Sequence, residues 1–382
     1  MSKLIWEDFE IPVRIPKQGY TANPRLFSPD GKRLYCAYDS AEFHRPSSID
    51  MVYSDDDGLT WCDDPITVSH APDRACANPA FTVLDGEVLI AHRAVKREGS
   101  RTLGKLMMSA SRDMVHWRYH STIIEEDNEG FFGVWEPQFL WVDGKLAVAY
   151  SNDSRRVVPK PSMQNLEYKI WEGGRWGEVQ IISDGEKTGS RDGMPVWDHA
   201  PNGIALVLEA TVDRDRHPFV IQQTNSRDLI HWTENRTIYV PKKEGRKAGA
   251  PYLAILPDGR GVVSFQTDED STQAGDAYSV MKIMESKVPW HDNLSCGDFT
   301  EPITVFGIPD GYNSLWTGMY LQRVPLRLRR SQLSHLPDPA QTRKNRITQL
   351  SKLFNIKENY TNGKLQEGIY RIHGAIQCAS LR

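Results

Sequence analysis

The sequence has few cysteines and no long apolar run. Its five cysteines are odd in number and none lies in a CxxC pair, so neither a disulfide framework nor a zinc site is indicated. No window approaches 18 consecutive apolar residues, so no transmembrane helix is predicted. The N-terminal segment MSKLIWEDFEIP lacks the apolar core of a secretory signal. These absences favour a cytoplasmic location.

The net charge is small, at −4, but it is unevenly distributed. Residues 323–382 contain twelve Lys and Arg against three Asp and Glu, a net charge of +9. Residues 1–322 carry 34 basic and 47 acidic residues, a net charge of −13, which disfavours nucleic acid as a partner. We therefore predict one folded domain over 1–322 and a basic, poorly ordered C-terminal appendage over 323–382.

Two residue types recur along the chain with the same period. One series consists of prolines 55 to 58 residues apart, namely Pro24, Pro79, Pro137, Pro195 and Pro251. The other consists of tryptophans 56 to 59 residues apart, namely Trp61, Trp117, Trp176, Trp232 and Trp290. Agreement between two unrelated residue types indicates a repeat architecture.

Each repeat contains four short apolar runs in the same order. The first two flank a turn such as SPDGK, LDGE or VDGK, whose Asp-Gly pairs suit tight β-hairpins. Four antiparallel strands in a unit of this size are typical of a propeller blade. Five blades are complete by about residue 307, and a sixth begins with a strand at 312–320 but lacks its remaining strands. The segment 3–15 is a candidate to supply a closing strand.

Three turns between the third and fourth strands match an Asp-box pattern. Residues 54–61 match in full, and residues 111–117 and 226–232 match in part. In such a turn the Asp and Ser side chains bond neighbouring backbone amides and the Trp packs between sheets. We interpret Asp56, Asp113 and Asp228 as structural.

Antiparallel geometry predicts which residues line one mouth of the ring. The first strand begins at the same end at which the second strand finishes, while the Asp-box turns lie at the other end. Residues just before or early in first strands are Arg25, Asn78, Glu136, Asp192, Tyr252 and Asn313. Residues that end second strands are Asp39, His92, Arg93, Asn152, Glu209, Gln266 and Asp268.

Two glutamates in this set point to glycoside hydrolysis. Glu136 opens an inner strand next to the axis, and Glu209 ends an apolar run in the neighbouring blade, where burial should disfavour its ionisation. Two carboxyl groups about 5–5.5 Å apart support a retaining mechanism, and a separation of about 6.5–9.5 Å supports inversion. The alternative is that each glutamate forms a buried structural ion pair with Arg25, Arg93 or Arg191.

Several motifs in order resemble glycoside hydrolase family 93. They are residues 135–137 (WEP), 190–195 (SRDGMP), the strand ending at Glu209, 250–252 (APY) and 263–269 (VSFQTDE). The resemblance covers roughly residues 18–320. It implies an all-β, sialidase-like six-bladed β-propeller, here with an incomplete sixth blade, and an exo-α-1,5-L-arabinanase that retains configuration and releases arabinobiose. It implies Glu136 as the acid/base and Glu209 as the nucleophile.

The same resemblance implies an oligosaccharide or polysaccharide substrate. We further predict a monomer without a cofactor or a membrane partner, and the acidic runs at 55–57 and 268–270 lack EF-hand spacing, so no metal site is predicted. Secretion, as in the family, is the alternative location. Trp135, Trp197, Tyr252 and Trp316 are either stacking surfaces for furanose rings or blade packing. The residues predicted to bind substrate are Arg25, Asn78, Arg93, Asp192, Tyr252, Gln266, Asn313 and Trp316.

Three other functions fit parts of the sequence. A non-catalytic glycan-binding propeller would keep the aromatic residues without requiring both glutamates. A sialidase-like hydrolase of another glycan would need several arginines at the mouth and a tyrosine nucleophile. Five-bladed arabinanases and fructosidases use an Asp with a Glu acid, which the Glu/Glu pair disfavours. Activity on arabinan also depends on whether the incomplete sixth blade leaves the ring functional.

Overall fold

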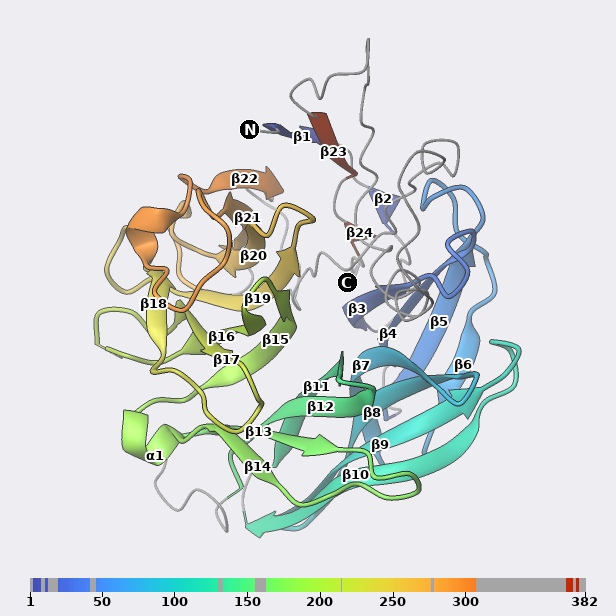
Figure 1. Ribbon diagram of the computed structural model, residues 1–382. Helices are drawn as coiled ribbons and strands as arrows, with labels where there is room; N and C mark the ends of the chain where they lie inside the picture. Colours follow the sequence, from blue (N-terminus) through green and yellow to red (C-terminus); the bar gives the residue numbers. More distant parts are fainter. Residues whose placement is uncertain are drawn as a thin grey trace.

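Five four-stranded antiparallel sheets make up most of the described part of the chain (Figure 1). The computed structural model describes residues 3–7, 11–12, 20–41, 46–129, 133–154, 163–213, 215–275, 278–306, 369–373 and 376–377. In every sheet the strands are ordered as they occur in the sequence, so each sheet is a meander joined by hairpins.

The strand boundaries follow the predicted repeats. The first two sheets contain β3 (Tyr20–Phe27), β4 (Leu34–Ala41), β5 (Ser48–Ser54) and β6 (Ile66–Ser69), then β7 (Ala75–Leu84), β8 (Glu87–Glu98), β9 (Arg101–Ser111) and β10 (Arg118–Glu129). The third and fourth contain β11 (Val134–Val142), β12 (Lys145–Asn152), β13 (Asn165–Ile170) and β14 (Gln180–Ser183), then β15 (Gly193–Ala200), β16 (Gly203–Ala210), β17 (Val220–Ser226) and β18 (Arg236–Tyr239). The fifth contains β19 (Ala248–Ile255), β20 (Gly261–Thr267), β21 (Val280–Glu285) and β22 (Ile303–Phe306).

The sheets are arranged as blades around a common axis. The first strands β3, β7, β11, β15 and β19 each contact the next one in the series, so they form the inner wall of the ring. This arrangement is a β-propeller. The prediction of six blades needs correction, because the described residues form five. The expected sixth-blade strand at 312–320 lies outside them, as does the predicted boundary at 322.

Two short parallel pairings connect the ends of the chain. Strand β1 (Lys3–Glu7) pairs with β23 (Ile369–His373), and β2 (Ile11–Pro12) pairs with β24 (Ile376–Gln377). Figure 1 draws both pairs between β22 of the fifth blade and β3 of the first. The N-terminal segment thus forms strands, and their partners lie within the segment 323–382.

Four apolar layers lie between neighbouring blades, and the repeating tryptophans belong to them. Trp117, Trp176, Trp232 and Trp290 each pack in a cluster built from their own blade and the preceding one. Trp61 packs on residues of the first blade alone. The period in tryptophan therefore reflects the contact between successive sheets.

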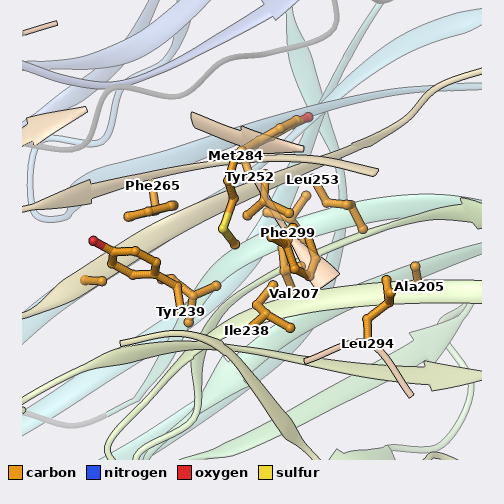
Figure 2. Close-up of a cluster of buried hydrophobic side chains, with 14 of the residues drawn as sticks. Ala205, Val207, Ile238, Tyr239, Tyr252, Leu253, Phe265, Met284, Leu294 and Phe299 are labelled. Atoms are coloured by element: carbon orange, nitrogen blue, oxygen red, sulfur yellow. The ribbon is translucent and has the colours of Figure 1, made fainter. Parts of the chain in front are cut away.

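The layer between the fourth and fifth blades is shown in Figure 2. Val207 and Ile238 from the fourth blade meet Tyr252, Phe265 and Phe299 from the fifth. Trp290 in this layer is 1% exposed, and its indole Nε1 donates to Asn225 Oδ1 at 2.8 Å. A Cβ at Gly261 would lie 2.2 Å from the Trp290 ring, so only glycine fits beneath it.

The turns after the third strands have the hydrogen bonds that join Asp and Ser to backbone amides. Asp56 Oδ1 accepts from Thr60 N at 2.8 Å, and Ser54 Oγ accepts from Gly58 N at 2.9 Å. Asp113 and Asp228 accept from backbone amides in the same way. The described helices are α1 (Gly185–Thr188) and the 3₁₀ turn η2 (Cys296–Asp298), and neither has the length to cross a membrane.

Candidate active site

A β-bulge interrupts the first strand of every blade at the residue before the repeating proline. The backbone there is left-handed, with φ between 48° and 57°, at Asn23, Asn78, Glu136, Met194 and Ala250. Each bulge coincides with a shift in register between the first and second strands. A left-handed conformation is uncommon for residues other than glycine, and here it occurs five times. It is therefore a property of the architecture, and Glu136 is not unusual in having it.

A second set of equivalent positions faces these bulges from the second strands. Residues that pair immediately before each bulge are Asp39, Arg93, Ser151, Glu209 and Gln266. The two sets together form the mouth of the propeller, at the end where first strands begin and second strands end. The mouth brings together the predicted residues Asn78, Arg93, Glu136, Glu209 and Gln266.

Glu136 is held by two hydrogen bonds from neighbouring strands. Its Oε2 accepts from the backbone amide of Met194, in the next blade, at 2.9 Å and from Ser151 Oγ at 3.1 Å. Burial raises the pKa of Glu136, and the positive charge of Arg191, these hydrogen bonds and the charge of Arg93 oppose that rise. The site thus supports the ionised form of this carboxyl group better than burial alone would.

Glu209 has fewer stabilising partners. Its Oε2 accepts from the backbone amide of Ala250, in the fifth blade, at 2.9 Å. Burial, followed by the negative charge of Glu136, raises the pKa of Glu209 to about 7. The influence of Glu136 on this pKa means that the two carboxyl groups share one electrostatic environment, in which the first to ionise disfavours the second.

Two glycines leave the space that the Glu209 carboxyl group occupies. A Cβ at Gly249 would lie 2.6 Å from Glu209 Oε2, and one at Gly193 would lie 3.3 Å from Glu209 Oε1. Gly193 precedes Met194, whose amide binds Glu136. Gly193 therefore lies beside the Glu209 carboxyl group, and Met194 binds the Glu136 carboxyl group. Both groups lie against the same two-residue segment of the mouth.

A third buried carboxyl group occupies the first blade. Asp39 Oδ1 accepts from the backbone amide of Asn78 at 2.8 Å, and Asp39 Oδ2 accepts from Asn23 Nδ2 at 2.6 Å. This repeats the contact of Glu209 with Ala250, since in both cases an acid on a second strand binds the bulge of the next blade. Sequence analysis placed Asp39 at the mouth but gave it no role. Asp39 occupies the same position in the first blade as Glu209 does in the fourth. The strand register was needed to recognise this equivalence.

Asp39 should make the stability of the protein depend on pH. Burial raises its pKa from 3.8 to about 7. A carboxyl group whose pKa is higher in the folded state stabilises the fold fully below its unfolded pKa and loses this effect as the pH rises through about 7. We expect the melting temperature to fall between pH 5 and pH 8, and we expect Asp39→Asn to reduce this fall.

The measurement is thermal unfolding followed by circular dichroism at both pH values. Asp143→Asn, an exposed change in the turn between β11 and β12, is the control and should leave the difference as in the wild type. An equal pH dependence in wild type and Asp39→Asn would contradict the assignment.

The mouth also contains an aromatic and cationic wall. The guanidinium carbon of Arg93 lies 3.4 Å from the centroid of the Trp135 ring, a cation–π contact. Trp135 Nε1 donates to Asp153 Oδ1 at 2.9 Å, and Arg191 approaches Asp153 Oδ2 at 3.7 Å. Burial lowers the pKa of Arg93 to about 10, so it remains a cation near neutral pH. Asp153 and Arg191 were not among the predicted binding residues.

Other predicted residues lie elsewhere. Asp192 is buried and accepts from Ser183 Oγ and Asn235 Nδ2, both near outermost strands, so its carboxyl group is directed away from the axis. Tyr252 and Trp197 belong to the layers between blades, so the packing alternative applies to them. Arg25 is 2% exposed, and its positive charge opposes the rise that burial causes in the pKa of Asp39. Asn313 and Trp316 lie outside the described residues.

Comparisons with known proteins agree with this architecture. Residues 105–291 match the family described as Glycosyl hydrolases family 32 N-terminal domain. No curated protein sequence matches the chain. Among solved structures, an α-L-arabinanase from Penicillium chrysogenum complexed with arabinobiose has 18% identity and a TM-score of 0.55, and the match covers 77% of this chain and 97% of that one.

Two further solved structures show the range of similarity. The α-L-arabinofuranosidase Arb93A from Fusarium graminearum, with an iminosugar inhibitor, has 18% identity and a TM-score of 0.53, over 78% of this chain and 98% of that one. A family 32 β-fructofuranosidase from Bombyx mori has 9% identity and a TM-score of 0.50, over 72% and 64%. These similarities establish the fold. The chain is an all-β propeller.

Within the propeller, nothing in the described residues assembles three or more His, Cys, Asp or Glu side chains around a point suited to a metal ion. The described residues at the mouth include the carboxyl groups, the two arginines and the backbone amides that donate to the carboxyl groups.

Proposed function

We propose that the protein is a retaining glycoside hydrolase that cleaves α-1,5-linked L-arabinan from the chain end and releases arabinobiose. The observation that carries the proposal is the pair of buried carboxyl groups, Glu136 and Glu209, bound by adjacent backbone and unequal in their surroundings. Glycoside hydrolysis with retention requires such a pair, one ionised and one protonated. The α-L-arabinanase with bound arabinobiose and the α-L-arabinofuranosidase, both of similar fold, support the choice of substrate.

The surroundings of the two groups favour roles opposite to those that the family resemblance suggested. Glu136 accepts two hydrogen bonds and has Arg191 as its strongest opposing charge, which suits a nucleophilic carboxylate. Glu209 has a pKa of about 7, which suits an acid that is protonated near neutral pH. We therefore assign Glu136 as the nucleophile and Glu209 as the acid/base.

The reaction then proceeds by double displacement. Glu136 attacks the anomeric carbon while Glu209 gives its proton to the departing glycosidic oxygen, which forms a covalent glycosyl ester on Glu136. Loss of the negative charge on Glu136 lowers the pKa of Glu209, because repulsion between the two groups disappears. Glu209, now a carboxylate, takes a proton from water, whose oxygen attacks the anomeric carbon and releases Glu136.

The proposal is tested by incubating the purified full chain with debranched linear arabinan. We expect arabinobiose as the first product, and ¹H NMR of early time points should show the anomer of the substrate linkage. Initial formation of the opposite anomer would exclude the covalent mechanism. A ladder of longer oligosaccharides would exclude attack from the chain end.

A second substrate follows from the family 32 match over residues 105–291. Together with the similarity in fold to the family 32 β-fructofuranosidase from Bombyx mori, that match favours a β-fructofuranoside, another five-membered sugar ring, as the alternative to arabinan. Sucrose and inulin assayed under the same conditions should release no fructose. Release of fructose without any arabinose product would replace arabinan by a fructoside as the substrate.

A further inference from the structure

Asp153 contacts both Trp135, which stacks with Arg93, and Arg191, which lies near the two carboxyl groups of the mouth. It follows β12, and its backbone amide donates to Gly133 O at 3.0 Å while its Oδ1 accepts from Gly133 N at 2.8 Å. The same Oδ1 accepts from Trp135 Nε1 at 2.9 Å. The start of β11, which includes the residue next to Glu136, is therefore bound to one aspartate.

The indole of Trp135 is fixed on two sides. Asp153 binds its N–H edge, and the Arg93 guanidinium covers its face at 3.4 Å. Glu136 follows Trp135 directly, so contacts that fix the Trp135 indole also limit the movement of the rigid peptide that joins the two residues. The orientation of Trp135 thus constrains the backbone from which the Glu136 side chain extends.

The other oxygen of Asp153 faces Arg191, with 3.7 Å between Oδ2 and the guanidinium. Arg191 comes shortly before the segment 193–194, which touches Glu209 through Gly193 and Glu136 through the Met194 amide. The Asp153 side chain is only 10% exposed and that of Arg191 is 32% exposed, so solvent screens this pair incompletely.

We propose that Asp153 is a positioning residue for the two carboxyl groups, because it orients Trp135 with one oxygen and holds the Arg191 cation beside Glu136 and Glu209 with the other. The inference rests on the proposed function for its effect on catalysis, but the arrangement itself is independent of the substrate. Asp153 does not need to touch the sugar. Its effect passes through Trp135 and Arg191.

Three variants separate the two contacts. Asp153→Asn keeps an oxygen that can accept from Trp135 Nε1 but loses the charge that holds Arg191. Asp153→Ala loses both contacts together with the hydrogen bond from Gly133 N, and Arg191→Gln removes the cation. Asp143→Asn, an exposed change at the opposite end of the same blade, is the control. Circular dichroism at 25 °C identifies any variant that fails to fold.

The first readout is NMR of the full-length protein, which requires no turnover. The Trp135 indole N–H resonance, assigned with Trp135→Phe, should stay in place in Asp153→Asn and move in Asp153→Ala. The titrations of Glu136 and Glu209, followed by ¹³C labelling of glutamate carboxyl groups, should move to higher pH in Arg191→Gln because a nearby positive charge is lost. Asp153→Asn should move them in the same direction.

The direction of this shift decides the proposal. Loss of the negative charge of Asp153 would by itself move the carboxyl titrations to lower pH, so an upward shift reports displacement of Arg191. A downward or absent shift in Asp153→Asn, or an unmoved Trp135 resonance in Asp153→Ala, would overturn the positioning role.

The second readout is turnover of arabinan. Asp153→Ala should lower kcat/KM by about 100-fold, the effect of a misplacement of about 1 Å, mainly through kcat. The kcat/KM of Asp153→Asn should lie between those of Asp153→Ala and the wild type. The acidic limb of its pH profile should be shifted in the same way as that of Arg191→Gln. A wild-type protein without activity on any glycan, but with the expected NMR shifts, would refute the proposed function and leave the positioning role standing.

Discussion

Glu136→Ala and Glu209→Ala are expected to lose turnover of linear arabinan in two different ways. Removal of the nucleophile should lower kcat by at least about 10⁴-fold with every substrate, because no covalent intermediate can form. Removal of the acid/base should lower kcat on arabinan by about 10²–10⁴-fold. With a dinitrophenyl α-L-arabinobioside, whose leaving group needs no proton, Glu209→Ala should show a rapid burst and then a slow steady state.

Azide distinguishes the two roles. It should restore turnover in Glu209→Ala and give a glycosyl azide of retained configuration, because it attacks the covalent intermediate in the space that the carboxyl group leaves. In Glu136→Ala it should give the inverted azide by direct displacement. Glu178→Gln, an exposed change, is the control and should retain wild-type activity. An inverted azide from Glu209→Ala and a retained azide from Glu136→Ala would make Glu209 the nucleophile and Glu136 the acid/base. Unchanged activity in either variant would remove that residue from the mechanism.

The pH profile gives an independent check on the same assignment. Activity of the free enzyme should decline as the pH rises through about 7, because Glu209 must be protonated to act as the acid. It should decline in acid as Glu136 becomes protonated. In Glu209→Ala with the dinitrophenyl substrate, the basic limb of the burst rate should disappear and the acidic limb should remain.

Trp290→Ala is expected to cause the largest loss of stability of any single change in the layer between the fourth and fifth blades. Trp290 is 1% exposed, packs against Phe299 at 5.9 Å between ring centroids and covers Gly261. Truncation of a buried tryptophan costs about 3–5 kcal/mol, and the unpaired Asn225 Oδ1 adds about 1–3 kcal/mol. The free energy of unfolding should therefore fall by roughly 4 kcal/mol or more, measured by urea denaturation.

A matched control lies on the same face of the propeller. Ile230 is 71% exposed in the turn after β17, and Ile230→Ala should change the free energy of unfolding by no more than about 0.5 kcal/mol. Trp290→Phe keeps part of the ring volume but loses the Asn225 hydrogen bond. Its loss in the free energy of unfolding should lie between those of Ile230→Ala and Trp290→Ala. A cost below about 1 kcal/mol for Trp290→Ala would mean that the layer can repack around the missing ring.

Much of the blade organisation could be predicted because it repeats. Asp-Gly or Asn-Gly turns, alternating apolar runs and one proline and one tryptophan per repeat are local signals, and five copies of each reinforce the pattern. The mouth was predictable to the same extent, since antiparallel pairing alone places the start of the first strand beside the end of the second. Hence Glu136, Glu209, Arg93, Asn78 and Gln266 were found together.

The direction of individual side chains could not be predicted in this way. Asp192 and Tyr252 lie near the starts of first strands as expected, but a position along a strand does not fix where its side chain finds partners. Asp192 binds outer strands, and Tyr252 packs between blades. The sequence offered Arg191 only as an ion-pair partner of the glutamates. Its contact with Asp153 was not predicted, because it joins two loops that follow different strands and no period in the sequence marks such a pair.

The sequence by itself determined the repeat, the strand order and the two glutamates, because these depend on local propensity and on spacing along the chain. Only the tertiary structure decided that the bulge amides of one blade bind the carboxyl groups of the blade before it, that Asp39 repeats the environment of Glu209, and that Glu136 and Glu209 have unequal surroundings. The physical reason is that hydrogen bonding, burial and charge at the mouth arise between blades, from residues about 40 to 60 positions apart.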